Sequence, residues 1–245
     1  MIDSPLDKHE KVALHFSGGK DSLAVVQLLA NQLDRVTIYH GDTGDQLPEQ
    51  QASVAYVEAL APHFVRIRSD VRGWIKTNGL PSDLVPYASH PIGRALGQET
   101  VPIVPRYDCC WENIMRPLLE RTRADGCTLL IRGTKRCDAP AFPFLSGDVD
   151  PVTGIEFWYP LEHWTDHDVL AFLRNSGAPV PPYYDAGLKG APDCAHCTAW
   201  LDEGRGAYLK AHHPEIWREY RAGLIAILQA LGDPMRHLQR EMQNG

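Results

Sequence analysis

The chain has 245 residues, of which 44% are hydrophobic, 22% charged and 9% aromatic, and this balance excludes both a disordered and a collagen-like chain. A net charge of −7 opposes unaided binding to phosphate backbones, so a nucleic-acid substrate would require a local basic patch or a partner protein. The longest apolar runs, such as LAVVQLLA, are far shorter than the ~20 residues that span a bilayer, which predicts no membrane helix and no membrane partner.

The N-terminal segment, MIDSPLDKHEK, contains no apolar signal core, so we expect a cytoplasmic protein. The cytosol keeps thiols reduced, and the six cysteines are therefore expected to bind metal or act in catalysis before they form disulfides. Cys127 precedes an apolar strand and is expected in the core, whereas Cys137 is a candidate reactive thiol.

Short apolar runs alternate with helical patterns through most of the chain. Strands are predicted at 12–16, 36–40, 63–68, 128–133 and 154–161, and helices at 22–33, 48–61 and 111–126. Pro48 stands at a favourable first helical position, and Ile114, Leu118 and Thr122 share one helix face. Alternating strands and helices predict an α/β fold with a doubly wound, mostly parallel sheet that binds its ligands at the carboxyl ends of the strands.

The remaining segments are predicted from local signals. Residues 70–106 are rich in Gly and Pro without clear periodicity, which predicts an irregular insertion with short helices. Thr165 followed by Asp168 resembles a capping box for a helix that ends at Gly177. A helical pattern over 214–231 predicts a helical C-terminal segment, so we expect a main domain over 1–200 and a helical extension over 201–245.

The strongest local signal is SGGKDS at residues 17–22, between a predicted strand and a predicted helix. Two glycines allow backbone N–H groups to approach an anion, the helix N-terminus adds a positive dipole, and Lys20 adds a charge. These features predict a phosphate cradle that is distinct from a Walker A loop, and the alternative is an ordinary Gly-Gly turn. The binding residues of this loop are Ser17, Gly18, Gly19, Lys20, Asp21 and Ser22.

This loop resembles that of the PP-loop ATP pyrophosphatase superfamily, which implies an adenine nucleotide alpha-hydrolase-like fold. The resemblance implies that the chain binds ATP with Mg2+, cleaves it between the α and β phosphates, and holds the pyrophosphate in this loop with Lys20 and Asp21 in catalysis. GDTG at 41–44 is similar to the second acidic turn of the superfamily, which implies that Asp42 lies near the nucleotide and its magnesium.

The second signal is a cysteine pattern, Cys109-Cys110 and, far along the chain, Cys194-Ala-His-Cys197. A single zinc ion requires its four sulfurs ~3.8 Å apart, and two adjacent residues rarely point both thiolates at one atom. In a four-iron, four-sulfur (4Fe-4S) cluster each thiolate binds a different iron, which suits this pattern better. The alternatives are a structural four-cysteine zinc site and unligated core cysteines.

The cysteine pattern is similar to that of assimilatory adenylylsulfate (APS) reductases, within the wider phosphoadenylylsulfate (PAPS) reductase family, and the resemblance extends from Val12 to about Thr198. It implies that GTKRCDAP at 133–140 is the basic segment of the family, with Gly133 at the cofactor and with Lys135 and Arg136 as catalytic clamps on phosphate or sulfate. The alternative for the two basic residues is a solvated charge pair. His196, inside the CxxC, is expected to tune the cluster by hydrogen bonding.

Three departures from the sulfonucleotide reductases favour another activity. The reductases carry a nucleophilic cysteine on a C-terminal tail, whereas the last cysteine here is Cys197. Their loop usually lacks the lysine that this chain has, and they commonly place Arg-Lys where this chain has Asn113 and Ile114. The lysine-containing loop is the form found in relatives that bind a complete ATP.

We therefore expect an iron-sulfur ATP pyrophosphatase that adenylates an acceptor for sulfur transfer, and the resemblance favours the ATP-pyrophosphatase component of DNA phosphorothioation systems. Expected partners are a sulfur donor such as a cysteine desulfurase and further subunits in a homo-oligomer or complex. One alternative is an APS or PAPS reductase that borrows its thiol from Cys137 or a partner, and another is a non-enzymatic, nucleotide-sensing iron-sulfur module. The acceptor is left open, as is the role of the cluster.

Overall fold

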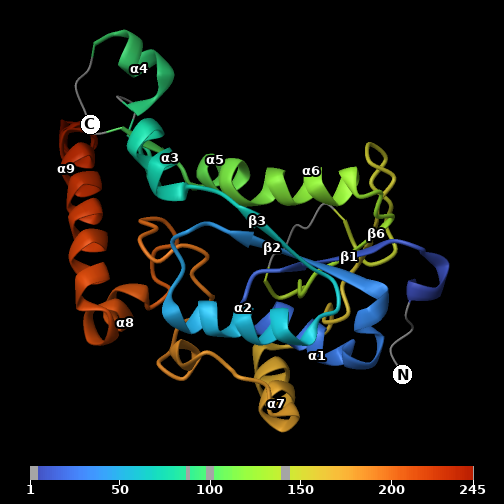
Figure 1. The fold of residues 1–245 in the computed structure, drawn as a ribbon. Helices are drawn as coiled ribbons and strands as arrows, with labels where there is room; N and C mark the ends of the chain where they lie inside the picture. Colours follow the sequence, from blue (N-terminus) through green and yellow to red (C-terminus); the bar gives the residue numbers. More distant parts are fainter. Residues whose placement is uncertain (1–4, 87–88, 98–101, 139–143, 245) are drawn as a thin grey trace.

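A computed structural model describes residues 5–86, 89–97, 102–138 and 144–244. Its centre is a parallel sheet of five strands in the order β3-β2-β1-β6-β7 (Figure 1). The strands are β1 (Val12–Phe16), β2 (Val36–Asp42), β3 (Phe64–Arg68), β6 (Leu129–Ile131) and β7 (Glu156–Trp158). All five predicted strands are confirmed, and the prediction of a doubly wound parallel sheet is confirmed with them.

The position of β1 determines where the sheet can bind a ligand. This strand pairs in parallel with β2 on one side and with β6 on the other, and the chain leaves the centre in opposite directions toward β3 and β7. Connections on the two sides therefore diverge at the carboxyl ends of β1 and β6 and leave a crevice there. The glycine loop, residues 17–22, begins at this point.

Helices cover both faces of the sheet (Figure 1). On one face lie α1 (Lys20–Leu28), α2 (Pro48–Leu60) and α7 (Asp166–Ser176), and their apolar residues share a core cluster with alternate residues of β1. On the other face Leu118 of α6 (Arg116–Ala124) packs with Ala13, Tyr39, Leu130 and the buried Cys127. The alternation of β1 between the two clusters is the pattern expected of a strand buried on both sides.

The helix that covers the second face has an irregular start. It runs from α5 (Arg106–Cys110) through a π-helical turn, η4 (Trp111–Met115), into α6. Leu118 and Thr122 are buried and Ile114 packs against the same core, as their shared helix face predicts. A π turn widens the helix at one point and is often found at functional sites, and here it directly follows the paired cysteines.

The insertion at 70–106 contains more regular structure than the sequence predicts. It holds α3 (Val71–Asn78), α4 (Pro91–Ala95) and a separate parallel pair, β4 (Leu80–Ser82) with β5 (Ile103–Pro105). The short helices were expected, but the pair of strands was not. Strands of three residues are too short to show periodicity, and both contain proline. Residues 87–88 and 98–101 of this insertion lie outside the described part of the chain.

The C-terminal third follows its local signals closely. Thr165 and Asp168 form the predicted capping box at the start of α7, and Gly177 ends that helix with φ +70. Two helices follow, α8 (Arg205–His212) and α9 (Pro214–Asn244). The last helix continues past the predicted end at 231, and Pro234 lies inside it. Among the described residues, no helix is both long and apolar enough to cross a membrane.

Candidate functional site

The glycine loop presents backbone N–H groups at the start of α1. Gly19 caps the helix without a side-chain acceptor, and Gly18 has φ +85, a conformation that favours glycine. The Lys20 N–H donates to the Tyr184 hydroxyl at 2.9 Å. Within the described part of the chain, the N–H groups of Gly18, Asp21 and Ser22 have no protein acceptor. These donors and the helix dipole form a site suited to an anion.

Glycine is required in this region because other backbone and side chains approach closely. A Cβ on Gly18 would lie 2.9 Å from Gln50 Cγ, and one on Gly19 would lie 3.0 Å from Ala191 Cβ. A Cβ on Gly133 would lie 2.6 Å from the Asp21 carbonyl carbon. The segment after β6 therefore packs directly against the first turn of α1.

A charge cluster built around two buried lysines lies beside the loop. The Lys20 Nζ is 2.9 Å from Asp21 Oδ2 and 3.0 Å from Asp166 Oδ1. The Lys135 Nζ is 2.7 Å from Asp21 Oδ1, 2.9 Å from Asp138 Oδ2 and 3.2 Å from Asp166 Oδ1. Lys20 is 4% exposed and Lys135 is 0% exposed, so both ammonium groups depend on these carboxylates for compensation.

The pKa shifts in this cluster follow from burial and charge. Burial by itself lowers the pKa of Lys135, but the neighbouring Asp21 and Asp138 outweigh it and raise that pKa. Burial acts on Asp166 in the opposite direction, and Lys20 and Lys135 outweigh it and lower the pKa of this carboxyl group. Lys135 therefore stays charged at neutral pH, and it binds the loop's own Asp21 instead of projecting as an unpaired cation.

Two predicted binding residues lie apart from this cluster. Arg136 is 59% exposed at its side chain and its Nε is 3.0 Å from Glu162 Oε1, which is the surface charge pair of the alternative interpretation. Asp42 accepts from Arg66 at 3.3 Å and from the Gly44 N–H at 3.1 Å, on the β3 side of the sheet. Residues 139–140 of the predicted basic segment lie outside the described part of the chain.

A cavity of about 470 Å³, the large cavity, opens at the carboxyl ends of β1 and β6. Its polar lining includes Ser17, Asp21, Ser22, Arg132, Asp138 and Asp193, and its apolar lining includes Phe16, Ile114, Leu118 and Leu119. Small-molecule sites are typically clefts of ~300–1,000 Å³ with mostly apolar walls and a few polar groups. The large cavity has the size and lining of a site for a nucleotide-sized ligand.

The four predicted ligand cysteines line one second cavity of about 210 Å³, the cysteine cavity. Cys109 and Cys110 come from α5, and Cys194 and Cys197 come from the loop before α8. Burial, with a contribution from the charge of Cys197, raises the pKa of both Cys109 and Cys110 to about 12. A bound metal would offset this cost, because cations stabilise the thiolate form.

The four thiols face one cavity from two different segments of the chain. Among the described residues, no group of three or more His, Cys, Asp or Glu converges as ligands of a single ion. The four thiols line one cavity without converging on one point.

The second acidic turn holds the CxxC loop in place. Asp45 Oδ1 lies 2.6 Å from His196 Nδ1, and Asp45 Oδ2 accepts from the His196 N–H at 3.1 Å. Thr43 Oγ1 donates to the Asp193 carbonyl at 3.1 Å. The resemblance places this turn near the nucleotide through Asp42. In the structure the turn also binds the cysteine loop, through Thr43 and the adjacent Asp45.

The two cavities are adjacent. Cys110, Ile114, Asp193 and Trp200 line both of them. Trp200 has φ +59, and the Arg106 guanidinium lies 3.9 Å from the centre of its ring. A non-glycine residue in this conformation is held there by its surroundings and is typical of functional sites. Whatever binds in the cysteine cavity therefore lies next to a ligand in the large cavity.

Comparisons with known proteins agree with this geometry. The fold is an adenine nucleotide alpha-hydrolase fold: a crystal structure of PAPS reductase from Candida auris, in a phosphate complex, matches with a TM-score of 0.54 and 16% identity over 75% of this chain and 81% of that chain. The chain is also 24% identical over 202 residues to adenosine 5'-phosphosulfate reductase from Allochromatium vinosum, covering 80% of this chain and 71% of that protein.

An uncharacterized 37.8 kDa protein of Escherichia phage 186 is 25% identical over 239 residues, which covers 80% of this chain and 70% of that protein. No family model matches the chain. The likeness to the Candida auris structure is one of fold, and the likeness to the Allochromatium vinosum reductase is one of sequence.

Sequence analysis missed several residues of the site. Asp166 and Asp138 hold the two lysines, and Tyr184 accepts from the Lys20 N–H. Asp166 and Tyr184 come from segments distant in the sequence, whereas Asp138 lies three residues after Lys135, inside the predicted basic segment. Arg132, in contrast, could have been found by continuing the alternation of β6 one residue past its end.

Proposed function

We propose that this chain is an ATP pyrophosphatase that converts ATP to AMP and pyrophosphate and adenylates an acceptor for sulfur transfer. One observation carries the proposal: the free N–H groups of the glycine loop lie beside a cavity of about 470 Å³, which has the size of a nucleotide site. The APS reductase relative and the fold add support, since both belong to enzymes that act on adenine nucleotides.

In the proposed reaction, an acceptor oxygen attacks the α-phosphorus of ATP and pyrophosphate leaves. The glycine loop would hold the departing diphosphate through its N–H groups and the dipole of α1. The positive charges of Lys20 and Lys135 would offset the negative charges of the neighbouring aspartates. The aspartates would then repel the phosphates less. A sulfur nucleophile would then attack the adenylated acceptor and displace AMP.

The chain's carboxylates fit a magnesium ion that arrives with the nucleotide. Asp21 and Asp138 line the large cavity, and Mg2+ usually binds one or two protein carboxylates together with substrate phosphates. Bound there, the ion would neutralise charge on the pyrophosphate. This assignment does not require Asp42, which is paired with Arg66.

Cys109, Cys110, Cys194 and Cys197 would hold the 4Fe-4S cluster. The bound cluster would supply a polarisable charged group beside the reacting phosphates. His196 would position the CxxC loop through its contact with Asp45. The proposed sulfur transfer is DNA phosphorothioation, for which a partner protein would supply the nucleic-acid contacts and a cysteine desulfurase the sulfur.

The test is to incubate anaerobically purified protein with ATP and Mg2+ and to measure pyrophosphate and AMP. Lys20→Ala should abolish release of both products, because it removes a charge from the cluster beside the loop. Lys210→Ala, which changes an exposed lysine of α8, is the matched control and should leave turnover unchanged. ATP cleavage by the Lys20 variant at the normal rate would contradict the proposed site.

A second candidate, sulfonucleotide reduction, is favoured by the match to the Allochromatium vinosum reductase. This reaction would require a nucleophilic thiol, and Cys137, the candidate from the sequence, is exposed and is absent from the lining of the large cavity. Sulfite release from APS or PAPS with thioredoxin would support this function. Nucleotide binding without either product would instead favour a nucleotide-sensing module.

A further inference from the structure

Arg132 directly follows β6 and lies beside His15 at the end of β1. Leu14 pairs with Ile131 in the parallel register, so the next positions along both strands are His15 and Arg132. Side chains alternate between the faces of a strand. Leu130 packs in the cluster on the α6 face, and Arg132, two residues later, is therefore directed to the same face and into the large cavity that it lines.

The surroundings of Arg132 leave its charge without a partner. Its backbone N–H donates to the Trp158 carbonyl at 3.1 Å, which fixes the backbone. In the described part of the chain, no hydrogen bond or ion pair of its guanidinium is found. Burial lowers the pKa of Arg132, and the charges of Tyr159 and Asp193 only partly oppose this effect. A half-buried cation without a hydrogen-bonded partner is a favourable site for an anion.

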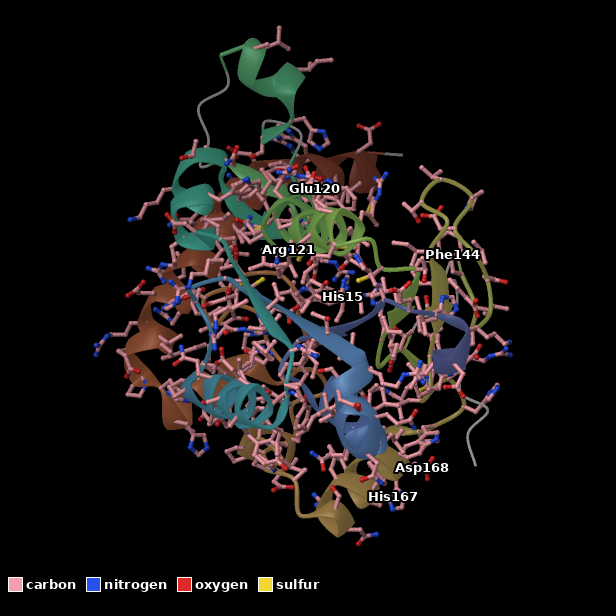
Figure 2. The ribbon with its side chains drawn as sticks, turned by 45° about the vertical axis from the view of Figure 1, so that its right-hand side comes forward. His15, Glu120, Arg121, Phe144, His167 and Asp168 are labelled. Atoms are coloured by element: carbon pink, nitrogen blue, oxygen red, sulfur yellow. The ribbon has the colours of Figure 1, made fainter. Side chains whose placement is uncertain are left out.

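Three other basic side chains of the described residues near the glycine loop are already paired. Lys20 and Lys135 contact carboxylates at 3.2 Å or less, and Arg136 is paired with Glu162 at the surface. His15 adds no charge, because burial, assisted by Arg132, lowers its pKa to about 3. Its Nε2 lies 2.9 Å from Thr122 Oγ1, and Figure 2 shows His15 in the interior beneath α6.

We propose that Arg132 binds a substrate oxyanion inside the large cavity. Under the proposed function, on which this inference rests, that group is the α-phosphate of ATP, because the glycine loop takes the terminal diphosphate. The planar guanidinium has several donors in a fixed fork, which suits phosphate or sulfate oxygens. Arg132 would thus hold the phosphorus that reacts, next to the wall shared with the cysteine cavity.

The experiment measures binding without turnover, by titration calorimetry with AMP, adenosine and inorganic sulfate. AMP carries the α-phosphate without the diphosphate, and adenosine carries neither. Arg132→Gln should weaken AMP binding about ten- to a hundredfold, the effect expected for losing hydrogen bonds to a charged group, and leave adenosine binding unchanged. Arg132→Lys keeps the charge but loses the planar fork of donors. Its affinity for AMP should therefore lie between that of the original protein and that of Arg132→Gln.

Arg174→Gln is the matched control, because this exposed arginine pairs with Asp185 away from the cavity, and it should bind AMP like the original protein. Thermal unfolding of each variant separates a local loss from misfolding. Equal AMP affinity in the Arg132→Gln variant would overturn the inference, and so would an equal loss for AMP and adenosine. Sulfate that competes with AMP in the original protein, but not in the Arg132→Gln variant, would support the inference.

The two proposals fail in different ways. Arg132-dependent AMP binding without pyrophosphate release from ATP would refute the proposed function and leave the anion site standing. Pyrophosphate release with AMP affinity unaffected by Arg132→Gln would refute only the anion site. If the original protein does not bind AMP, the anion site is also refuted, whatever the result with ATP.

Discussion

Replacing Gly133 by alanine should loosen the junction between β6 and α1. The added Cβ would lie 2.6 Å from the Asp21 carbonyl carbon, 2.7 Å from the Ser22 nitrogen and 2.8 Å from the Asp21 carbonyl oxygen, whereas ordinary contacts begin at 3.4 Å. All three neighbours are backbone atoms at the start of α1, so no side chain can rotate away. The two segments must separate by several tenths of an ångström, which moves Lys135 relative to Asp21.

Overpacking of this kind costs about 1–3 kcal/mol. For a chain of 245 residues each kcal/mol lowers the melting temperature by roughly 2–4 °C. Gly232→Ala provides the contrast: it lies within α9, where alanine is favoured over glycine by about 1 kcal/mol, and its nearest neighbour is the flexible end of Arg236. Thermal unfolding followed by circular dichroism should therefore show a fall for Gly133→Ala and a small rise for Gly232→Ala. A Gly133→Ala protein as stable as the original would refute the close-packing argument.

Three further changes have defined outcomes. Cys194→Ser should remove the visible absorbance of the anaerobically purified protein and lower its stability, because binding of the proposed cluster would be coupled to folding; stoichiometric zinc in the original protein would contradict this. Burial lowers the pKa of His15 from 6.5 to about 3. Between these two pH values the imidazole is therefore protonated in the unfolded chain and neutral in the folded chain. The unfolded state therefore binds more protons, stability should fall as the pH decreases from about 6.5 toward 3, and a pH-stability profile unchanged in His15→Gln would exclude this origin. Thr165→Ala removes one half of the capping box and should cost about 1 kcal/mol in urea unfolding, and an unchanged midpoint would show that the cap is dispensable.

Local patterns were sufficient where one short segment determines its own structure. The five strands, the capping box of α7 and the left-handed Gly177 each depend on neighbouring residues, and the sequence predicts them correctly. Cys109 and Cys110 line one cavity with the two cysteines of the CxxC. The sequence predicts this because two separate cysteine motifs in one chain indicate a common metal centre. The strand pair β4-β5 lacks any such local signal.

The electrostatics of the site could not be predicted in the same way. A lysine in a phosphate-binding motif looks like a free cation in the sequence, but Lys20 and Lys135 share Asp21, Asp138 and Asp166 in the folded chain. These two lysines and three carboxylates carry a net charge of −1, which repels a free nucleotide anion. Under the proposed function, binding of ATP would therefore require additional positive charge. Among the described residues, the free N–H groups of the glycine loop and the unpaired Arg132 would contribute to it, together with a magnesium ion carried by the nucleotide.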